Sequence, residues 1–152
     1  MSYTFQVPKD YGYVVLITAF SMVLAVWHAL QIGQFRKRAK VPFPHHYAPQ
    51  RAYDKDARAA NAFDCAQRAH GNYLENHPTV MMSMLVAGLE YPRSTAVLGG
   101  LWCVARIMYL VGYVTSGPGE NGKRRRLGTW FFIPQVGLMG LLAFVGWGLL
   151  VS

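Results

Sequence analysis

The sequence has few charged residues, few cysteines and none of the common short motifs for metal or nucleotide binding. Of its 152 residues, 14% are charged and 53% are hydrophobic, whereas about 25% of residues are charged in an average soluble domain. Two cysteines are too few for a disulfide framework. No CxxC, HExxH, GxGxxG or GxxxxGK[ST] spacing occurs, so the sequence predicts neither a metal site nor a nucleotide site.

The charges that are present lie mainly in the middle of the chain. Residues 36–79 hold 12 of the 22 charged side chains and four of the five histidines. The net charge of +8 would suit nucleic acid, but the cations flank apolar runs, which is typical of the cytosolic side of a membrane protein. The composition therefore predicts a membrane protein with a polar middle and no nucleic-acid partner.

Long uncharged runs predict membrane-spanning helices. Residues 11–35 form a run of 25, enough to cross a hydrocarbon core of about 30 Å as a helix. Residues 94–116 are interrupted only by Arg106, and Pro78 is expected to bend the second helix. We predict an all-α integral membrane protein, a bundle of four transmembrane helices in a single domain over residues 1–152. The expected helices are about 11–38, 57–90, 94–116 and 127–151, with loops at about 39–56 and 117–126.

The distribution of cations predicts the orientation. Seven Lys and Arg lie in residues 36–58 and four lie in residues 117–126, whereas the opposite side has only Lys9 and Arg93. The positive-inside rule places both basic loops in the cytosol and both termini on the other side. The first span has most of its cations after it, which predicts an uncleaved anchor and not a signal peptide.

A polar stripe runs along the second helix. At about 100° per residue, one face carries five polar side chains: Asn61, Asp64, Arg68, Asn72 and Glu75. The third helix has a matching face: Arg106, Tyr109 and Tyr113. Ionisable groups within a membrane tend to mark functional sites, and this set complements a small zwitterionic peptide with more than one carboxylate. Two alternatives stay open: Arg68 only forms an ion pair with Glu75 or Asp64, or the start of the second helix simply protrudes into the cytosol.

Residues 63–78 of this helix read FDCAQRAHGNYLENHP. This segment resembles the R-A-x-x-N-x-x-E-x-x-P signature of the MAPEG family of membrane proteins. Within that family, further segments resemble the type 3 microsomal glutathione transferases: QRAH at 67–70, RKRAKV at 36–41, EYPR at 90–93 and RIMYLVGY at 106–113. The resemblance extends from about Tyr11 to Gly128.

The resemblance implies a subunit of four helices that forms a homotrimer and binds glutathione between subunits near the cytosolic face. The implied glutathione ligands of the second helix are Arg68, Asn72 and Glu75, with His70 as a further candidate. The adjoining subunit would add Tyr109 and Tyr113, with Arg106 close by. Arg36 and Lys37 match basic family positions at the end of the first helix. The arginine that holds the glutathione sulfur as thiolate would be Arg124, which fits an R-x-x-[LI]-G pattern, with Arg125 and Arg126 as alternates.

The implied activity is that of a glutathione transferase with glutathione peroxidase activity. Glutathione is then the co-substrate, no metal takes part, and the partner is a lipophilic electrophile or lipid hydroperoxide from the membrane lipid. A leukotriene C synthase-like activity belongs to the same class. The alternatives are a non-catalytic lipid-binding or scaffold protein of the family and a small four-helix exporter, for which residues 11–35 lack a proton-coupling carboxylate. The expected location is the endoplasmic reticulum, with the outer mitochondrial membrane as the alternative.

Overall fold

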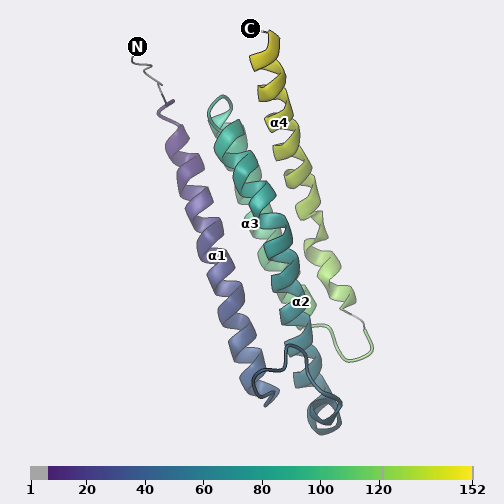
Figure 1. Cartoon of the computed structure of the whole chain (residues 1–152). Helices are drawn as coiled ribbons and strands as arrows, with labels where there is room; N and C mark the ends of the chain where they lie inside the picture. Colours follow the sequence, from purple (N-terminus) through teal and green to yellow (C-terminus); the bar gives the residue numbers. More distant parts are fainter. Residues whose placement is uncertain (1–6, 121, 152) are drawn as a thin grey trace.

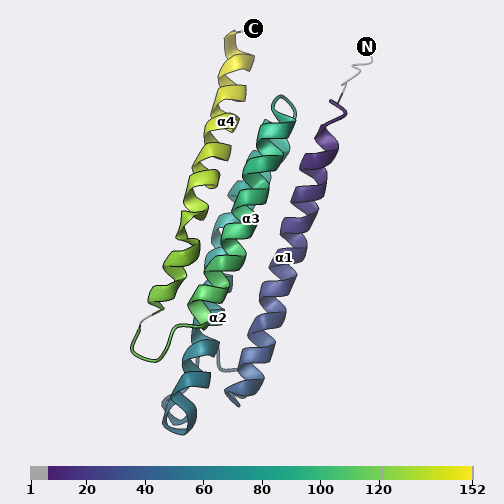
Figure 2. The same ribbon diagram turned by 180° about the vertical axis from the view of Figure 1, so that it is seen from behind.

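The structure is a computed structural model that describes residues 7–120 and 122–151. Its long helices are α1 (Tyr11–Arg38), α2 (Gln50–Ala87), α3 (Pro92–Val114) and α4 (Phe132–Val151), and a 3-10 helix, η1 (Lys123–Phe131), leads into α4. The helices lie side by side, and α1 begins at the end of the bundle where α4 ends (Figure 1). Both α1 and α4 pack against α2 and α3, from opposite sides (Figures 1 and 2). The predicted all-α bundle is confirmed.

The outer helices present apolar faces. Among the described residues, three segments are long and apolar enough to cross a membrane: Tyr11–Arg38, Pro92–Val114 and Lys123–Val151. Large side chains such as Leu16 of α1 and Ile133 of α4 are 69% and 74% exposed, which suits contact with lipid tails. The second helix, α2, is longer still, with 38 residues, but the polar stripe lowers its mean hydropathy below that of a simple span.

The second helix starts earlier than predicted. Residues 50–55, expected in a loop, are helical, because Pro49 stands just before the first turn, where proline suits a helix start. The break comes at Asp56, whose φ of −154° and ψ of 86° are not helical. Its Oδ1 accepts a 2.9 Å hydrogen bond from the backbone N–H of Ala59, so Asp56 acts as the N-cap of the longer segment. The helix then continues through Pro78 with helical φ and ψ.

The predicted loop at 117–126 is also shorter than expected. Lys123–Phe131 form the 3-10 helix η1, which packs along α3, so the predicted start of the fourth helix at residue 127 falls inside η1. At Gly128, a Cβ would lie 2.2 Å from the backbone N of Tyr109 and 2.4 Å from the carbonyl O of Ala105. The two backbones therefore approach so closely that only glycine fits between them. The cations of this segment led to the prediction of a loop, although the chain there is helical.

We expect Gly128→Ala to lower the free energy of unfolding by about 1–3 kcal/mol, the usual cost of overpacking. The atoms that a methyl group would meet belong to the backbone of α3 and cannot rotate away. Thermal unfolding of the detergent-solubilised protein, followed by circular dichroism, measures the change. Gly12→Ala is the matched control, because nothing lies within 4 Å of a Cβ there. Equal stability of the two variants would contradict the close approach of η1 to α3.

Candidate functional site

Arg106 lies at the centre of the bundle and is 0% exposed. Its Nη1 donates a 2.7 Å hydrogen bond to Oδ1 of Asn72, and its Nη2 donates a 3.4 Å bond to the carbonyl O of Ala69. Four aromatic rings have centroids within 5.6 Å of its guanidinium carbon: Tyr73, Trp102, Tyr109 and Phe131. Within the described residues, its Nε has no hydrogen-bond partner. The guanidinium is therefore held by neutral oxygens and aromatic faces, which stabilise a cation.

A chain of amides connects this arginine to the fourth helix. The side-chain amide of Asn76 donates a 2.8 Å hydrogen bond to the carbonyl O of Asn72. Gln135 of α4 donates to Oδ1 of Asn76 at 2.9 Å and accepts from the indole N–H of Trp102 at 3.3 Å. Sequence reasoning did not find Gln135. Its position could have identified it, because a side-chain amide within the apolar run of α4 needs a polar partner.

The two predicted polar faces meet at one small cavity. Arg68 of α2 and Tyr113 of α3 both line this cavity, and the ring of Tyr113 lies 5.5 Å from that of Tyr109. The cavity beside them has a volume of about 170 Å³ and is lined by Tyr53, Asn61, Asp64, Cys65, Arg68, Tyr113 and Gly122. Glu75 is exposed on the same helix and interacts electrostatically with Arg106 and Tyr109. The stripe residues thus surround one region of the subunit.

Asp64 fixes the loop that closes one side of this cavity. Its Oδ1 accepts a 2.8 Å hydrogen bond from the backbone N–H of Ala48, and its Oδ2 accepts a 2.9 Å bond from the Tyr53 hydroxyl. Burial, followed by this hydrogen bond to the carboxylate, raises the pKa of Tyr53 to about 12. The Tyr53 hydroxyl therefore remains protonated at neutral pH and serves as a donor. Asp64 therefore has a structural role. Its carboxylate does not compete with a ligand for the other polar groups of the cavity.

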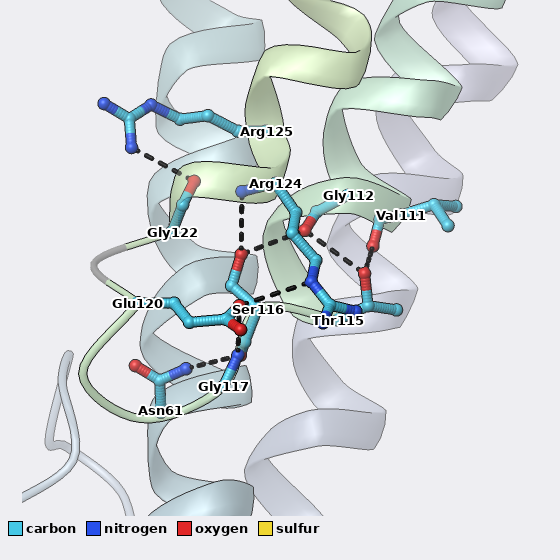
Figure 3. Close-up of polar contacts among 10 residues, drawn as sticks. All are labelled: Asn61, Val111, Gly112, Thr115, Ser116, Gly117, Glu120, Gly122, Arg124 and Arg125. Carbon is cyan, nitrogen blue, oxygen red and sulfur yellow. Dashed lines mark hydrogen bonds and ion pairs between the residues drawn. The ribbon is translucent and has the colours of Figure 1, made fainter.

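The three consecutive arginines of η1 differ in their surroundings. The guanidinium of Arg125 lies 5.4 Å from the centroid of the Tyr113 ring, and its Nη1 donates to the carbonyl O of Gly122 at 3.1 Å. Arg124 instead forms a 3.3 Å ion pair with Glu120. Figure 3 shows the two side chains leaving η1 in different directions. Arg126 is exposed. Arg125 therefore lies beside Tyr113, whereas Arg124 is paired with Glu120, and neither side chain lines the cavity itself.

Three other predicted site residues lie elsewhere in the subunit. Arg36 donates to the carbonyl oxygens of Pro42 and His45 at 3.4 and 2.7 Å, so it holds the loop after α1. Lys37 is exposed near the same end. The His70 ring lies 6.2 Å from that of His28 on α1, in the packing between the first two helices. None of the three lines the cavity beside Tyr113.

Residues of the two polar faces also lie close together within a single chain. Arg68 and Tyr113 line the same cavity, and Asn72 accepts from Arg106. Asn72 thereby faces α3, whereas Arg68 and Glu75 of the same stripe are exposed. The contacts of Tyr109 and Tyr113 with Arg68 and Asn72 across a boundary between subunits stay a prediction.

The fold and this region define an integral membrane protein, a helical bundle with a buried arginine and a polar face shared by two helices. The model of the MAPEG family matches residues 14–144. The chain belongs to the MAPEG family, which includes membrane glutathione transferases and related enzymes. Within residues 7–120 and 122–151, no three His, Cys, Asp or Glu side chains form a group that could hold a metal ion.

We expect Asn72→Ala to lower the free energy of unfolding in the absence of glutathione by about 1.5–3 kcal/mol, the usual contribution of a hydrogen bond to a charged group. The change removes the oxygen that accepts from Arg106 at 2.7 Å. Asn72→Asp keeps an acceptor at this position and should retain most of the stability. Chemical denaturation in detergent measures both. If the alanine variant is as stable as the wild type, the Arg106 hydrogen bond does not hold α2 to α3.

Proposed function

We propose that this protein is a membrane-bound glutathione transferase that also acts as a glutathione-dependent peroxidase, similar to the type 3 microsomal enzymes. The observation that carries the proposal is the cavity lined by Arg68 and Tyr113, with Arg125 over the Tyr113 ring and with Arg106 bound to Asn72 on the same two helices. Membership of the MAPEG family supports glutathione as the co-substrate. The lipophilic substrate would come from the bilayer that surrounds the bundle.

The charges of this cluster match those of glutathione, a tripeptide with two carboxylates, one ammonium group and two amides. Arg68 can bind a carboxylate through its planar donors. Glu75 is exposed and has no hydrogen-bond or ion-pair partner within the described residues, so it can accept from the ammonium group. Asn72 and Tyr109 can bind amides. The positive charge of Arg106, close behind Asn72, favours the anionic groups.

Arg125 is our candidate for the residue that holds the sulfur as thiolate. A free thiol has a pKa of about 8.5, so most of it is protonated at neutral pH. A neighbouring guanidinium favours the thiolate by Coulomb attraction and does not accept the thiol proton, because arginine remains charged. The sequence pattern favoured Arg124, which forms an ion pair with Glu120.

Two reactions of the thiolate follow from this arrangement. In transfer, the sulfur forms a bond to an electrophilic carbon of the lipophilic substrate, and the leaving group departs with the bonding electrons and takes up a proton. In reduction, two glutathione molecules and one hydroperoxide give glutathione disulfide, an alcohol and water. In both reactions, the enzyme contributes a bound thiolate at the membrane surface, where it meets lipophilic substrates.

The remaining parts of the proposal concern assembly and location. We propose a homotrimer whose subunits complete one another's glutathione sites, with Arg36, Lys37 and His70 as further candidate contacts. The basic end that contains residues 39–58 and 117–126 faces the cytosol, in accord with the positive-inside rule. The membrane is that of the endoplasmic reticulum, with the outer mitochondrial membrane as the alternative. Microscopy of a tagged protein alongside markers of both membranes distinguishes the two.

The first test is direct binding of glutathione to the purified, detergent-solubilised protein. We expect Arg68→Ala and Glu75→Ala each to weaken binding by about 10- to 100-fold, because each removes a charge-assisted hydrogen bond to the ligand. Isothermal titration calorimetry measures the affinity. Glu90→Ala, in the turn that follows α2, and Lys123→Ala are controls that should bind glutathione as the wild type does. Absence of binding to the wild type would favour the non-catalytic scaffold.

The second test identifies the arginine that stabilises the thiolate. Addition of glutathione at neutral pH should produce a thiolate band in the ultraviolet difference spectrum of the wild type. We expect Arg125→Gln to lose this band while glutathione still binds, because the nearby positive charge is gone. Lys123→Gln, a change on the same 3-10 helix, should keep the band. Loss of the band in Arg124→Gln and not in Arg125→Gln would assign the role to Arg124.

A further inference from the structure

We propose that Arg38, Arg58 and Arg124 form a second site, which binds the negatively charged headgroup of an anionic phospholipid. The site is a cavity of about 620 Å³ at the end of the bundle where α1 ends and η1 begins. This volume lies in the range of small-ligand sites. None of the residues that line it also lines the cavity beside Tyr113. The proposal therefore concerns a cavity separate from the one beside Tyr113.

Three different parts of the chain bring the arginines to this cavity. Arg38 is the last residue of α1, Arg58 lies just after the break in α2, and Arg124 lies in η1. The turn between α3 and η1 forms one wall and is well fixed. There, Ser116 accepts a 3.2 Å hydrogen bond from the backbone N–H of Arg124, and its carbonyl O accepts one of 2.9 Å from Asn61 (Figure 3).

The charge of the cavity is strongly positive. Its single lining carboxylate is that of Asp56, and one oxygen of this group already accepts from the N–H of Ala59. Within the described residues, Arg58 has no hydrogen-bond or ion-pair partner, and the ion pair of Arg124 with Glu120 is partly exposed. Guanidinium groups bind phosphate oxygens in a planar, bidentate geometry. An anion with several oxygens, such as a phosphate group, therefore fits this cavity.

The position of the cavity along the bundle favours a lipid over a soluble anion. Phe35 and Val114, from the last turns of two membrane-spanning helices, form its apolar side. The arginines stand where the apolar spans end, which is the level of the headgroups in a bilayer. Basic pockets between transmembrane helices at this level bind anionic headgroups. A lipid can place its phosphate among the arginines and its acyl chains along the apolar side.

A neighbouring cavity extends the positive surface. It has a volume of about 480 Å³ and shares Arg38 and Asp56 with the first. Three further cations line it: Lys40, Arg51 and Lys55. A headgroup held by Arg38 and Arg58 therefore has additional cations on its solvent side, while no second carboxylate lines either cavity.

The test is lipid binding to the full-length, detergent-solubilised protein, measured by native mass spectrometry. The probes are dioleoylphosphatidic acid and dioleoylphosphatidylcholine, which have the same acyl chains and differ in headgroup charge. We expect phosphatidic acid to bind and phosphatidylcholine not to compete with it. Arg58→Gln and Arg38→Gln should each weaken phosphatidic acid binding by about fivefold, the effect of one cation near a charged membrane surface. Lys123→Gln removes a positive charge from the same end but outside the cavity and should have no effect.

Three results would overturn the proposal. Equal weakening by Arg58→Gln and Lys123→Gln would show diffuse attraction to the basic end. Equal binding of phosphatidylcholine would exclude recognition of charge. Displacement of phosphatidic acid by glycerol 3-phosphate at the same concentration would assign the cavity to a soluble phosphate compound. Glutathione binding is measured on each variant as a control for folding, and Arg38→Gln decides the matter if Arg58→Gln fails to fold.

Discussion

The burial of Arg106 constrains the whole bundle. A guanidinium in the middle of a membrane-spanning helix is costly unless polar or aromatic groups surround it. Here α2 supplies the oxygens of Asn72 and Ala69 at 2.7 and 3.4 Å. The centroid of the Phe131 ring, at the end of η1, lies 4.3 Å from the guanidinium carbon. The helices α2, α3 and η1 must therefore meet at the level of this arginine, and Asn72 of the polar stripe points inward because Arg106 is there.

The polar stripe of α2 is not held together by ion pairs among its own side chains. Among the described residues, the ion pairs are Arg93 with Asp10 and Arg124 with Glu120, and neither involves the stripe of α2. The alternative of simple ion pairing, between Arg68 and Glu75 or between Asp64 and Arg68, is therefore not what the structure adopts. Asp64 is occupied by Ala48 and Tyr53, and Arg106 has neutral partners. Arg68 and Glu75 of the stripe are thus not joined to each other in an ion pair, and both side chains are exposed.

The sequence was sufficient to predict four long helices, because uncharged runs of membrane-spanning length have few alternative structures. It was less informative at the membrane surface, where prolines and cations signal a loop even when the backbone is helical. Residues 50–55 and 123–131 are both helical for local reasons. Pro49 begins one segment, and Gly128 lets the other approach α3. The contact of Gln135 with Asn76 depends on where α4 packs, which no local pattern in the sequence specifies.

The arginines of η1 show why the sequence could predict which residues form the site but not how they are arranged in space. A 3-10 helix has three residues per turn, so consecutive side chains point about 120° apart. Arg124 and Arg125 therefore cannot serve the same cavity: one pairs with Glu120 and the other lies over Tyr113. In an α-helix or a flexible loop, the side chains of the same three arginines would point in other directions. The turn at Ser116 fixes this division, because it binds the backbone of Arg124 on one side and Asn61 on the other. One short turn thus separates two positively charged cavities, one beside the stripe of α2 and one at the level of the lipid headgroups.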